Sequence, residues 1–374
     1  DLVASGVNPD TIDFASIQLF GGGGRTLPFQ NNDDRPLDLP LIKVLADGAT
    51  DGIFNQEDAI YFYASGVDSW NWSESSERWQ HELHPWSDSA YYFLRINGPQ
   101  NVFGSRIESA TDVSLPVLDE LDSHLAKEFH EIESHNIAKS GREFYGERFT
   151  SLGSQIYGFS FNIPNLIGDS GWVDSRIAGR TLGATSNYLM ECNGSVASTT
   201  DISLSESSLL LAQKRNLSIH VPMSGDGINV EMSFEPGNAD AEGWIDYVRV
   251  QARQALVFAS GQFFINGTEN ISFSNAARYR LTESSSVDQI WDVTDPLSPS
   301  RNFLSQEGDV TTWKARQDTT RRFVAFRYGA AKGVRPMGSV DNLDLHGLGH
   351  LDLVIVTVPL LDSAARRLAT LHAN

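Results

Sequence analysis

The sequence contains a single cysteine, Cys192, among 374 residues. One cysteine excludes an internal disulfide, so the fold must depend on its hydrophobic core. The sequence also lacks any run of 18 apolar residues, which excludes a membrane-spanning helix. Its first residues do not show the basic and then apolar order of a secretory signal peptide. With 40% hydrophobic and 10% aromatic residues, the chain still has ample material for packed cores.

Positive charge is scarce as well. The chain has 28 Lys and Arg against 48 Asp and Glu, which gives a net charge of −20. A surface this acidic repels the phosphates of nucleic acid, so nucleic acid is excluded as a partner. The acid excess, with few lysines, is typical of a protein that stays solvated in high salt. It is equally typical of a protein kept soluble by net charge alone.

Residues 1–99 are expected to form a β-rich N-terminal domain. Apolar or alternating stretches at 12–20, 41–45, 59–64 and 90–96 have the pattern of strands. Residues 100–140 differ from this pattern and predict a helical linker to the next domain. Apolar residues recur there at steps of three and four, as in an amphipathic helix: Leu118, Leu121, Leu125, Phe129 and Ile132.

Residues 141–280 predict a β-sandwich of jelly-roll-like type. Six stretches alternate in polarity and are separated by Gly, Asn and Ser clusters: 157–163, 173–178, 187–192, 217–221, 227–234 and 244–252. Such sandwiches are frequent ligand-binding modules, although a fold alone does not set a function.

Residues 281–345 are expected to be a β-rich connecting segment with a strand at 323–326. Arginines are concentrated between positions 316 and 327. Arg321 and Arg322 are expected to pair with the acidic surface, and a patch for an anionic partner is the alternative interpretation.

The last segment predicts the start of an α/β domain at 346–374. Residues 351–358 are a nearly continuous, β-branched apolar run, which is typical of a strand buried on both faces of a parallel sheet. Residues 362–372 follow with the spacing of an amphipathic helix. We therefore expect the front part of a longer protein. Without parallel neighbours, this strand must pack on the preceding domain, pair with a second copy in a dimer, or be poorly ordered.

An acidic loop between two expected strands has the spacing of an EF-hand-like calcium site. Counted from Asp47, acids fall at positions one, five and twelve, a Gly at six and an Asn at nine, so that Asp47, Asp51, Asn55 and Asp58 are the candidate ligands. Position three is Ala49 and position twelve is an Asp rather than a Glu, and no helices flank the loop. The alternative is an Asp/Gly hairpin loop in which Asp58 holds backbone amides.

Aromatic residues gather between positions 68 and 88, with two histidines among them: Trp70, Trp72, Trp79, Trp86, His81 and His84. Tryptophans in a polar loop can stack on sugars or peptides, but they can also simply cap a β-sheet, which is the favoured interpretation. The His-x-x-His pair has no third ligand in the sequence, so zinc is not expected. Cys192 is expected to be a small buried residue in a strand, and a catalytic thiol is the alternative.

Several phrases, in this order, resemble one family: DGIFN (51–55), DAIYFYASG (58–66), GREFYGERF (141–149), FSFNIP (159–164), GWIDYVRVQAR (243–253), IWDVTDP (290–296), NLDLHGL (342–348) and LDLVIVT (351–357). The ordered set resembles the N-terminal region of gingipain-type cysteine peptidases, up to the first strand of their catalytic domain. Within that family the likeness is strongest to the sortase of the type IX secretion system.

The resemblance implies an enzyme on the extracellular face of the outer membrane, or secreted, that removes C-terminal sorting domains from secreted proteins. Protein cargo and type IX secretion components are then the implied partners. The catalytic Cys and His of the family belong to a caspase-like domain and are expected beyond Asn374, so no catalytic residue is assigned and enzymatic activity of this chain is left open. The expected function is a non-catalytic region that positions cargo or docks partners. The alternative is a stand-alone carbohydrate- or protein-binding β-sandwich of a secreted protein, and the only expected cofactor is calcium.

Overall fold

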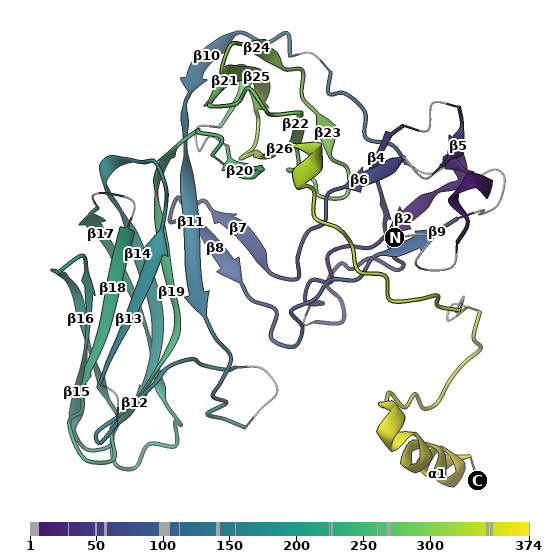
Figure 1. The fold of residues 1–374 in the computed structure, drawn as a ribbon. Coiled ribbons are helices and arrows are strands. Elements are labelled where there is room, and N and C mark those ends of the chain that lie inside the picture. Colours follow the sequence, from purple (N-terminus) through teal and green to yellow (C-terminus); the bar gives the residue numbers. More distant parts are fainter. Residues whose placement is uncertain are drawn as a thin grey trace. The chain divides into compact units, whose positions relative to one another are not determined.

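A computed structural model describes residues 7–28, 30–48, 51–55, 58–96, 105–111, 113–139, 143–153, 155–223, 225, 227–259, 261–267, 271–341, 344 and 347–373. The protein is mainly β, as predicted, with many antiparallel sheets and a C-terminal helix, α1 (Asp362–His372). Its contacts group the chain into two units. The larger unit spans Pro9–Gly333, and the smaller contains Val334–Asn374 (Figure 1).

The predicted β-sandwich is present, and all six expected strands lie in it. One layer has the order β11-β19-β14-β17, with β12 beside β19: β11 (Ser123–Glu131), β12 (Arg148–Thr150), β14 (Leu166–Arg180), β17 (Gln213–Pro222) and β19 (Glu242–Ala255). The other layer has the order β13-β18-β15-β16: β13 (Ile156–Asn162), β15 (Thr185–Cys192), β16 (Ser195–Ser203) and β18 (Gly227–Glu235). All pairings in both layers are antiparallel.

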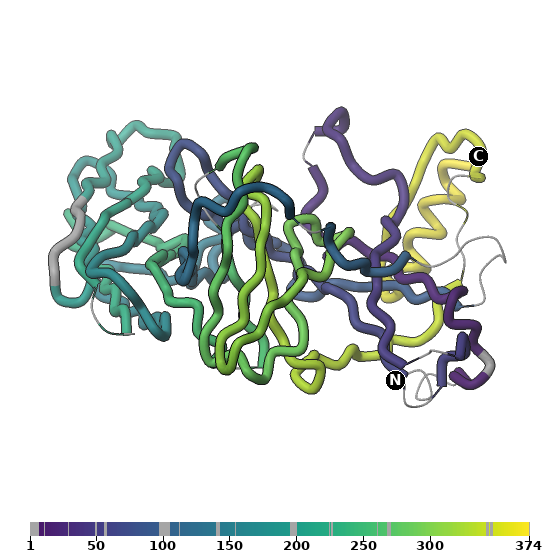
Figure 2. Tube along the Cα trace, turned by 90° about the horizontal axis from the view of Figure 1, so that it is seen from above, coloured from purple at the N-terminus to yellow at the C-terminus, as the bar shows by residue number. Residues whose placement is uncertain are grey.

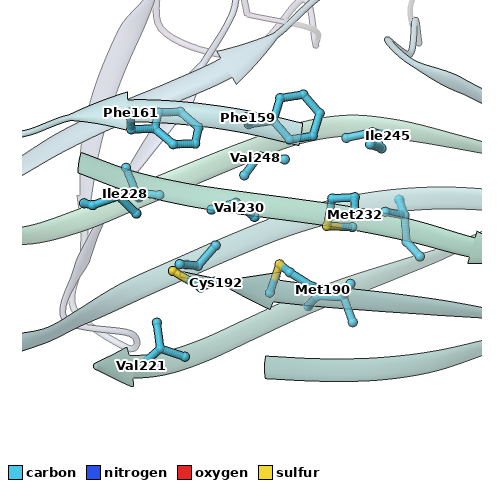
Figure 3. Packing of buried hydrophobic residues seen from close by; sticks show 14 of the residues in the cluster. Phe159, Phe161, Met190, Cys192, Val221, Ile228, Val230, Met232, Ile245 and Val248 are labelled. Atoms are coloured by element: carbon cyan, nitrogen blue, oxygen red, sulfur yellow. The ribbon is translucent and has the colours of Figure 1, made fainter. Parts of the chain in front are cut away.

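Alternation places the core of this sandwich between its two layers. In β18 every second residue from Ile228 to Phe234 is buried, and its neighbours are mostly exposed. Figure 3 shows Ile228, Val230 and Met232 of this strand with Phe159, Met190 and Val248 in one apolar cluster. Because burial of one such side chain contributes about 1.5–3 kcal/mol, this interface is a major source of stability.

The helix predicted within 100–140 is wrong. Residues 117–121 form β10 (Val117–Leu121), and most of the remaining apolar repeat lies in β11, which pairs with β19 along its whole length. Both faces of β11 are covered. Ala126 faces the sandwich core, and Phe129 faces an aromatic hairpin on the other side. Apolar residues therefore occur on both faces of the strand, and their spacing imitates a helical repeat.

A second, smaller sandwich occupies much of the predicted connecting segment. Its first sheet has the order β10-β21-β25-β24: β21 (Ser272–Thr282), β24 (Ser305–Glu307) and β25 (Val310–Gln317). Its second sheet has the order β20-β26-β22-β23: β20 (Gln262–Asn266), β22 (Gln289–Asp292), β23 (Ser300–Arg301) and β26 (Arg322–Phe326). Tyr279, Trp313 and Phe323 form the aromatic centre between the sheets. Figure 2 shows the strands between residues 262 and 326, in green, running side by side.

The N-terminal part consists of short strands, as expected: β1 (Ile12–Asp13), β2 (Gln18–Phe20), β3 (Leu41–Ile42), β4 (Val44–Asp47), β5 (Ile53–Phe54), β6 (Ala59–Phe62) and β9 (Phe93–Arg95). Three-residue 3₁₀ turns lie at Pro9–Thr11, Phe14–Ser16, Tyr328–Ala330 and Pro359–Leu361. The tryptophan-rich stretch forms the hairpin β7 (Ser69–Ser73) and β8 (Arg78–Glu82). The domain boundaries predicted from the sequence stay predictions.

In the smaller unit the helix is confirmed and the strand is not. Helix α1 matches the expected span of 362–372. Residues 351–358 form no strand, and within the described part of the chain they have no strand partner. Their apolar side chains are largely exposed, up to 93% for Val356. A strand of this type exists only when neighbouring strands satisfy its backbone, so the apolar pattern alone was not sufficient.

Candidate functional site

The hairpin β7–β8 lies on the outer face of the five-stranded sandwich layer. The backbone N–H of Trp79 donates to Gln251 Oε1 at 2.8 Å, and Gln251 Nε2 donates back to the Trp79 carbonyl at 3.0 Å. Arg78 forms an ion pair with Asp174 at 2.6 Å. Trp79 is 3% exposed. The tryptophans therefore cap a sheet, which is the interpretation that the sequence favoured.

A lysine is enclosed between this hairpin and β11. Lys127 Nζ lies 3.6 Å from the ring centroid of Trp79 and 5.0 Å from that of Trp70, and it donates to Asn266 Oδ1 at 2.7 Å. Burial, and then the positive charge of Arg322, lower the pKa of Lys127 to about 6. The two ring faces and the amide oxygen favour the ammonium form and oppose this effect. In its ammonium form Lys127 ties the hairpin to the sandwich at the cost of its hydration.

A histidine and a glutamate meet beneath the same hairpin. His81 Nε2 lies 2.6 Å from Glu131 Oε2, and Arg249 Nη1 lies 3.4 Å from His81 Nδ1. Burial, with a smaller contribution from Arg249, lowers the pKa of His81 to about 3. Because a guanidinium can only donate, Nδ1 accepts and the proton of the neutral ring is on Nε2. His81 therefore donates to Glu131.

Glu131 belongs to a small group of acids. It shares a hydrogen bond with Glu133, and Asp246 lies close to both. Burial raises the pKa of Glu131 and of Glu133 to about 7 each, and the neighbouring carboxylates add to the effect. Asp246 is held by Arg176, which offsets part of the rise that burial causes in its pKa. The pair of glutamates consequently holds a proton near neutral pH.

His81 and Glu131 could transfer protons, but they are closed to a substrate. The side chain of His81 is 1% exposed, and its ring stacks on Phe129 with 4.2 Å between centroids. General acid–base catalysis needs a group within hydrogen-bond reach of the reacting atom. The cluster therefore holds the hairpin on the sheet and is not an open active site.

An open hollow lies beside the hairpin. This tryptophan groove has a volume of about 340 Å³ and joins the hairpin to the second sandwich. Its walls are Trp70, Asn71, Trp72, Glu74, Trp79, Ile271, Thr294, Asp318, Thr319, Thr320 and Arg322. Aromatic faces beside hydroxyl, carboxylate and guanidinium groups suit sugars or peptide segments.

Arg321 pairs with acids as predicted, whereas Arg322, which lines the groove, forms no ion pair within the described residues. Arg321 Nη1 pairs with Asp292 at 2.7 Å, and Nη2 pairs with Asp318. Arg322 instead uses Nη2 to donate to the carbonyl of Thr294 at 3.0 Å, which is a neutral partner. Thr294 also accepts the Arg322 backbone N–H through Oγ1 at 3.0 Å. The wall of the groove is thus fixed by hydrogen bonds within the second sandwich.

The candidate calcium loop shows the backbone contacts of the alternative interpretation. Asp58 Oδ2 accepts the N–H of Asn55 at 2.8 Å, and Asp51 Oδ1 accepts the N–H of Ile53 at 3.0 Å. Asp47 ends β4, opposite the start of β6. Across the described ranges no three His, Cys, Asp or Glu residues gather as a metal-binding group. Residues 49, 50, 56 and 57 lie outside those ranges, and calcium binding stays an untested prediction.

The two histidines of the His-x-x-His pair serve different contacts. His81 is buried against Glu131, whereas His84 Nδ1 accepts the backbone N–H groups of Trp86 at 3.2 Å and Ser87 at 2.9 Å. Trp86 is 61% exposed and lies outside the hairpin. His84 therefore closes a local turn, and His81 helps the hairpin to cover the sheet.

Cys192 is buried in the core of the large sandwich, as expected. Figure 3 shows it among Met190, Val221 and Ile228. Burial raises the pKa of the thiol, which disfavours the thiolate that a nucleophile needs. A catalytic role of this cysteine has no support in the geometry.

Sequence reasoning missed the residues beneath the hairpin. Lys127, Glu131, Glu133 and Asp246 are brought together from β11, the segment after it, and β19. A signal did exist, because charged residues recur within the otherwise apolar stretch 244–252 that was expected to be a strand. A buried strand with regularly placed charges predicts a partner surface carrying opposite charges.

Comparisons with known proteins give an informative structural match. No protein-family model and no curated protein matches the sequence. The crystal structure of dimeric latent PorU from Porphyromonas gingivalis matches with a TM-score of 0.79 at 23% identity. The match covers 95% of this chain and 33% of PorU, so the chain spans about a third of that protein's length.

Two further solved structures are much less similar. A cycloisomaltooligosaccharide glucanotransferase from a Paenibacillus species has a TM-score of 0.22 at 8% identity, over 53% of this chain and 45% of that one. A delta-endotoxin from Bacillus thuringiensis has a TM-score of 0.24 at 10% identity, over 64% and 42%. These scores are too low to indicate a shared fold. The match to PorU, in contrast, shows that the protein has a PorU-like fold over 95% of its length.

Proposed function

We propose that this chain is the non-catalytic N-terminal region of a gingipain-like surface cysteine peptidase of the type IX sortase kind. Similarity to PorU, a type IX secretion sortase, over 95% of the chain carries the proposal. The burial of Cys192 agrees with it, because the catalytic Cys and His would then lie beyond Asn374. In this role the region positions protein cargo or docks secretion partners, on the extracellular face of the outer membrane or in the medium.

The exposed segment 351–358 fits the same proposal. Its apolar side chains would be covered by the parallel strands of a following caspase-like sheet, or by a second copy of the chain. The PorU structure is described as a dimer. No helix in the described residues is long and apolar enough to cross a membrane.

The reading frame of the native gene provides the first test. We expect it to continue past Asn374 and to encode a His and a Cys in a caspase-like strand and loop pattern. A stop codon directly after Asn374 would remove the sortase proposal. It would leave the binding module as the remaining function.

The positioning role needs a binding measurement. A purified C-terminal sorting domain from a type IX-secreted protein is titrated into the chain by calorimetry. Binding that weakens with Trp72→Ala, but not with Trp86→Ala, would place the cargo contact at the tryptophan groove. Trp86 is the matched control because it is exposed and lies outside this groove. Absence of any heat with several sorting domains would contradict cargo positioning by this region.

A second candidate function is a carbohydrate- or protein-binding β-sandwich module. The tryptophan groove supports it, because it combines aromatic faces with hydroxyl groups of Thr294, Thr319 and Thr320. The same titration with neutral oligosaccharides separates the two candidates. Saturable binding of an oligosaccharide, abolished by Trp72→Ala, would favour the module.

A further inference from the structure

The outer face of the first sheet of the second sandwich carries a row of cations. Arg278 and Arg280 alternate along β21 with Tyr279 and Leu281, which are buried. Lys314 and Arg316 alternate in the same way along the neighbouring strand β25, and Lys314 stands opposite Arg278. Alternation thus brings four positive side chains onto one face of two adjacent strands. This is unusual in a protein with a net charge of −20.

Three of these side chains, those of Arg278, Arg280 and Lys314, line a hollow, the basic groove, with a volume of about 630 Å³. The strands supply its floor: Glu120, Arg278, Arg280, Ser305, Glu307, Val310, Thr312, Trp313 and Lys314. Its rim comes from two segments that lie side by side, because the Ala110 N–H donates to the Arg301 carbonyl at 2.7 Å. The rim residues are Ala110, Thr111, Val113, Asn302, Phe303 and Leu304. A hollow of this size is in the range of ligand sites.

The charges in the basic groove are not balanced. Glu120 pairs with Arg278 at 2.7 Å, and Glu307 is the second acid in the lining. Arg280 and Lys314 have no ion pair among the residues that the structure describes, and both are exposed. They lie diagonally across adjacent strands, since Arg278 faces Lys314 and Arg280 faces Thr312. A carboxylate placed between two such cations gains attraction from both.

The rim adds an apolar component. Phe303 is 58% exposed and Leu304 is 36% exposed, next to the cations. The edge strand of the sheet, β24, follows directly and has β25 as its neighbour in the sheet order. An extended peptide beside it can form backbone hydrogen bonds while its side chains reach the groove. Cations, exposed apolar side chains and a sheet edge therefore meet at one place.

We infer that the basic groove binds an acidic peptide segment of another protein, with its carboxylates at Arg280 and Lys314 and an apolar side chain against Phe303. Charge complementarity selects this occupant. Nucleic acid does not fit, because most phosphates of its long row would lie beyond these two cations, against an otherwise strongly acidic surface. The inference uses only residues of the second sandwich, so it does not depend on the proposed function.

Fluorescence anisotropy with a labelled, blocked pentapeptide tests the inference. The probe has three glutamates, one phenylalanine and one valine, and its counterpart has glutamine at each glutamate. We expect the acidic probe to bind about tenfold more tightly than the glutamine probe, which corresponds to about 1.4 kcal/mol. Added salt should reduce this difference, because the contacts are exposed. Equal affinity for the two probes would overturn the inference.

A charge-reversal pair locates the site. Arg280→Glu plus Lys314→Glu should weaken binding of the acidic probe about tenfold or more. Lys332→Glu plus Arg335→Glu is the matched control, because both residues are exposed and both double variants change the net charge from −20 to −24. Equal losses in the two double variants would show an effect of net charge only and would reject the groove. Thermal melting of each variant confirms that it is folded, and Arg280→Gln plus Lys314→Gln replaces the reversal if it is not.

Two further measurements fix the chemistry of the occupant. Phe303→Ser should weaken the acidic probe several-fold, since it removes an exposed apolar contact but no charge. Vesicles of phosphatidylglycerol offer the same negative charge without a peptide. Vesicle binding that depends on Arg280 and Lys314, without binding of the acidic probe, would overturn the assignment to a peptide.

Discussion

His81 Nε2 and Glu131 Oε2 lie 2.6 Å apart, in the manner of an ion pair, but the imidazole is neutral. Burial lowers the pKa of His81 to about 3 and raises that of Glu131 to about 7. Between these values both groups are largely uncharged, and the contact is a neutral hydrogen bond. The two residues belong to β8 and β11, so this bond attaches the tryptophan hairpin to the sandwich without the full cost of burying two charges.

The first prediction concerns the dependence of stability on pH. Glu131 and Glu133 have a folded pKa of about 7 against 4.5 as the ordinary value. Between these two pH values the unfolded chain releases protons that the folded protein keeps, so the free energy of unfolding falls as pH rises. Glu131→Gln plus Glu133→Gln removes this titration. Relative to the wild type, the free energy of unfolding of the variant should rise by about 2 kcal/mol between pH 5 and pH 8. This figure is already reduced to allow for the partial exposure of Glu133.

Urea denaturation at pH 5, 6, 7 and 8 measures that gain. Glu74→Gln plus Glu77→Gln is the matched control, because both residues are exposed in the turn of the same hairpin. The control should follow the wild type at every pH. A constant offset between the glutamine variant and the wild type across the range would contradict the raised pKa values.

The second prediction concerns the buried lysine. Lys127 has a folded pKa of about 6 against 10.5, so the unfolded chain holds the proton more tightly and stability is lost as pH falls from 10.5 toward 6. Lys127→Met keeps the volume of the side chain and removes this loss. The variant should be more stable than the wild type at pH 7, and its advantage should shrink by pH 10. Lys332→Met, at an exposed position, should show no such trend. If the variant is less stable at pH 7, the ring faces of Trp70 and Trp79 outweigh the cost of dehydration.

The third prediction ranks the tryptophans. Trp79 is nearly fully buried and its backbone is held by Gln251, so Trp79→Ala should lower the free energy of unfolding by about 3–5 kcal/mol. Trp86→Ala changes an exposed side chain and should cost less than about 0.5 kcal/mol. Chemical denaturation of the two variants at one pH compares them directly. Equal losses would mean that the hairpin does not depend on burial of Trp79.

The local spacing of apolar and polar residues was sufficient to predict an element that has one buried and one exposed face. The alternation in 227–234 predicts β18, and the spacing in 362–372 predicts α1. The pattern failed at β11, where both faces are covered and apolar residues no longer alternate. It failed again at 351–358, where a strand would need neighbours that the described chain does not supply.

The candidate site was less predictable than the fold, because its contacts are distant in sequence. His81 and Glu131 are 50 residues apart, and Trp79 and Gln251 are 172 apart. Composition identified the tryptophans and histidines as a cluster, but it could not show which face they would cover. Only the pairing of β11 with β19 places Lys127 and Glu131 under the hairpin. Such nonlocal placement is set by the packing of whole sheets rather than by local propensity.

The fourth prediction concerns Cys192. Its thiol lies in the apolar core with a raised pKa, so a thiol reagent should label the protein only after denaturation. Cys192→Ser places a hydroxyl among apolar neighbours and should cost about 1–3 kcal/mol of stability. Cys192→Ala is the companion variant that adds no polar group. Rapid labelling of the folded protein by a peptide-based active-site probe would contradict this and would restore the cysteine as a nucleophile.

The last prediction addresses calcium at the loop of Asp47, Asp51, Asn55 and Asp58. If the loop binds the ion, calcium raises the Tm by mass action, and Asp47→Ala plus Asp51→Ala removes the increase. Asp33→Ala plus Asp34→Ala makes the same change of charge in another exposed loop and should keep the increase.

The backbone contacts of Asp58 do not need a metal. Gly48 has a φ of +87°, and a Cβ there would collide with the Asp58 carboxylate, so Gly48→Ala should destabilise the protein with or without calcium. Equal Tm values in calcium and in chelator would dismiss the ion, and the backbone contacts of Asp58 and Asp51 would then hold the loop.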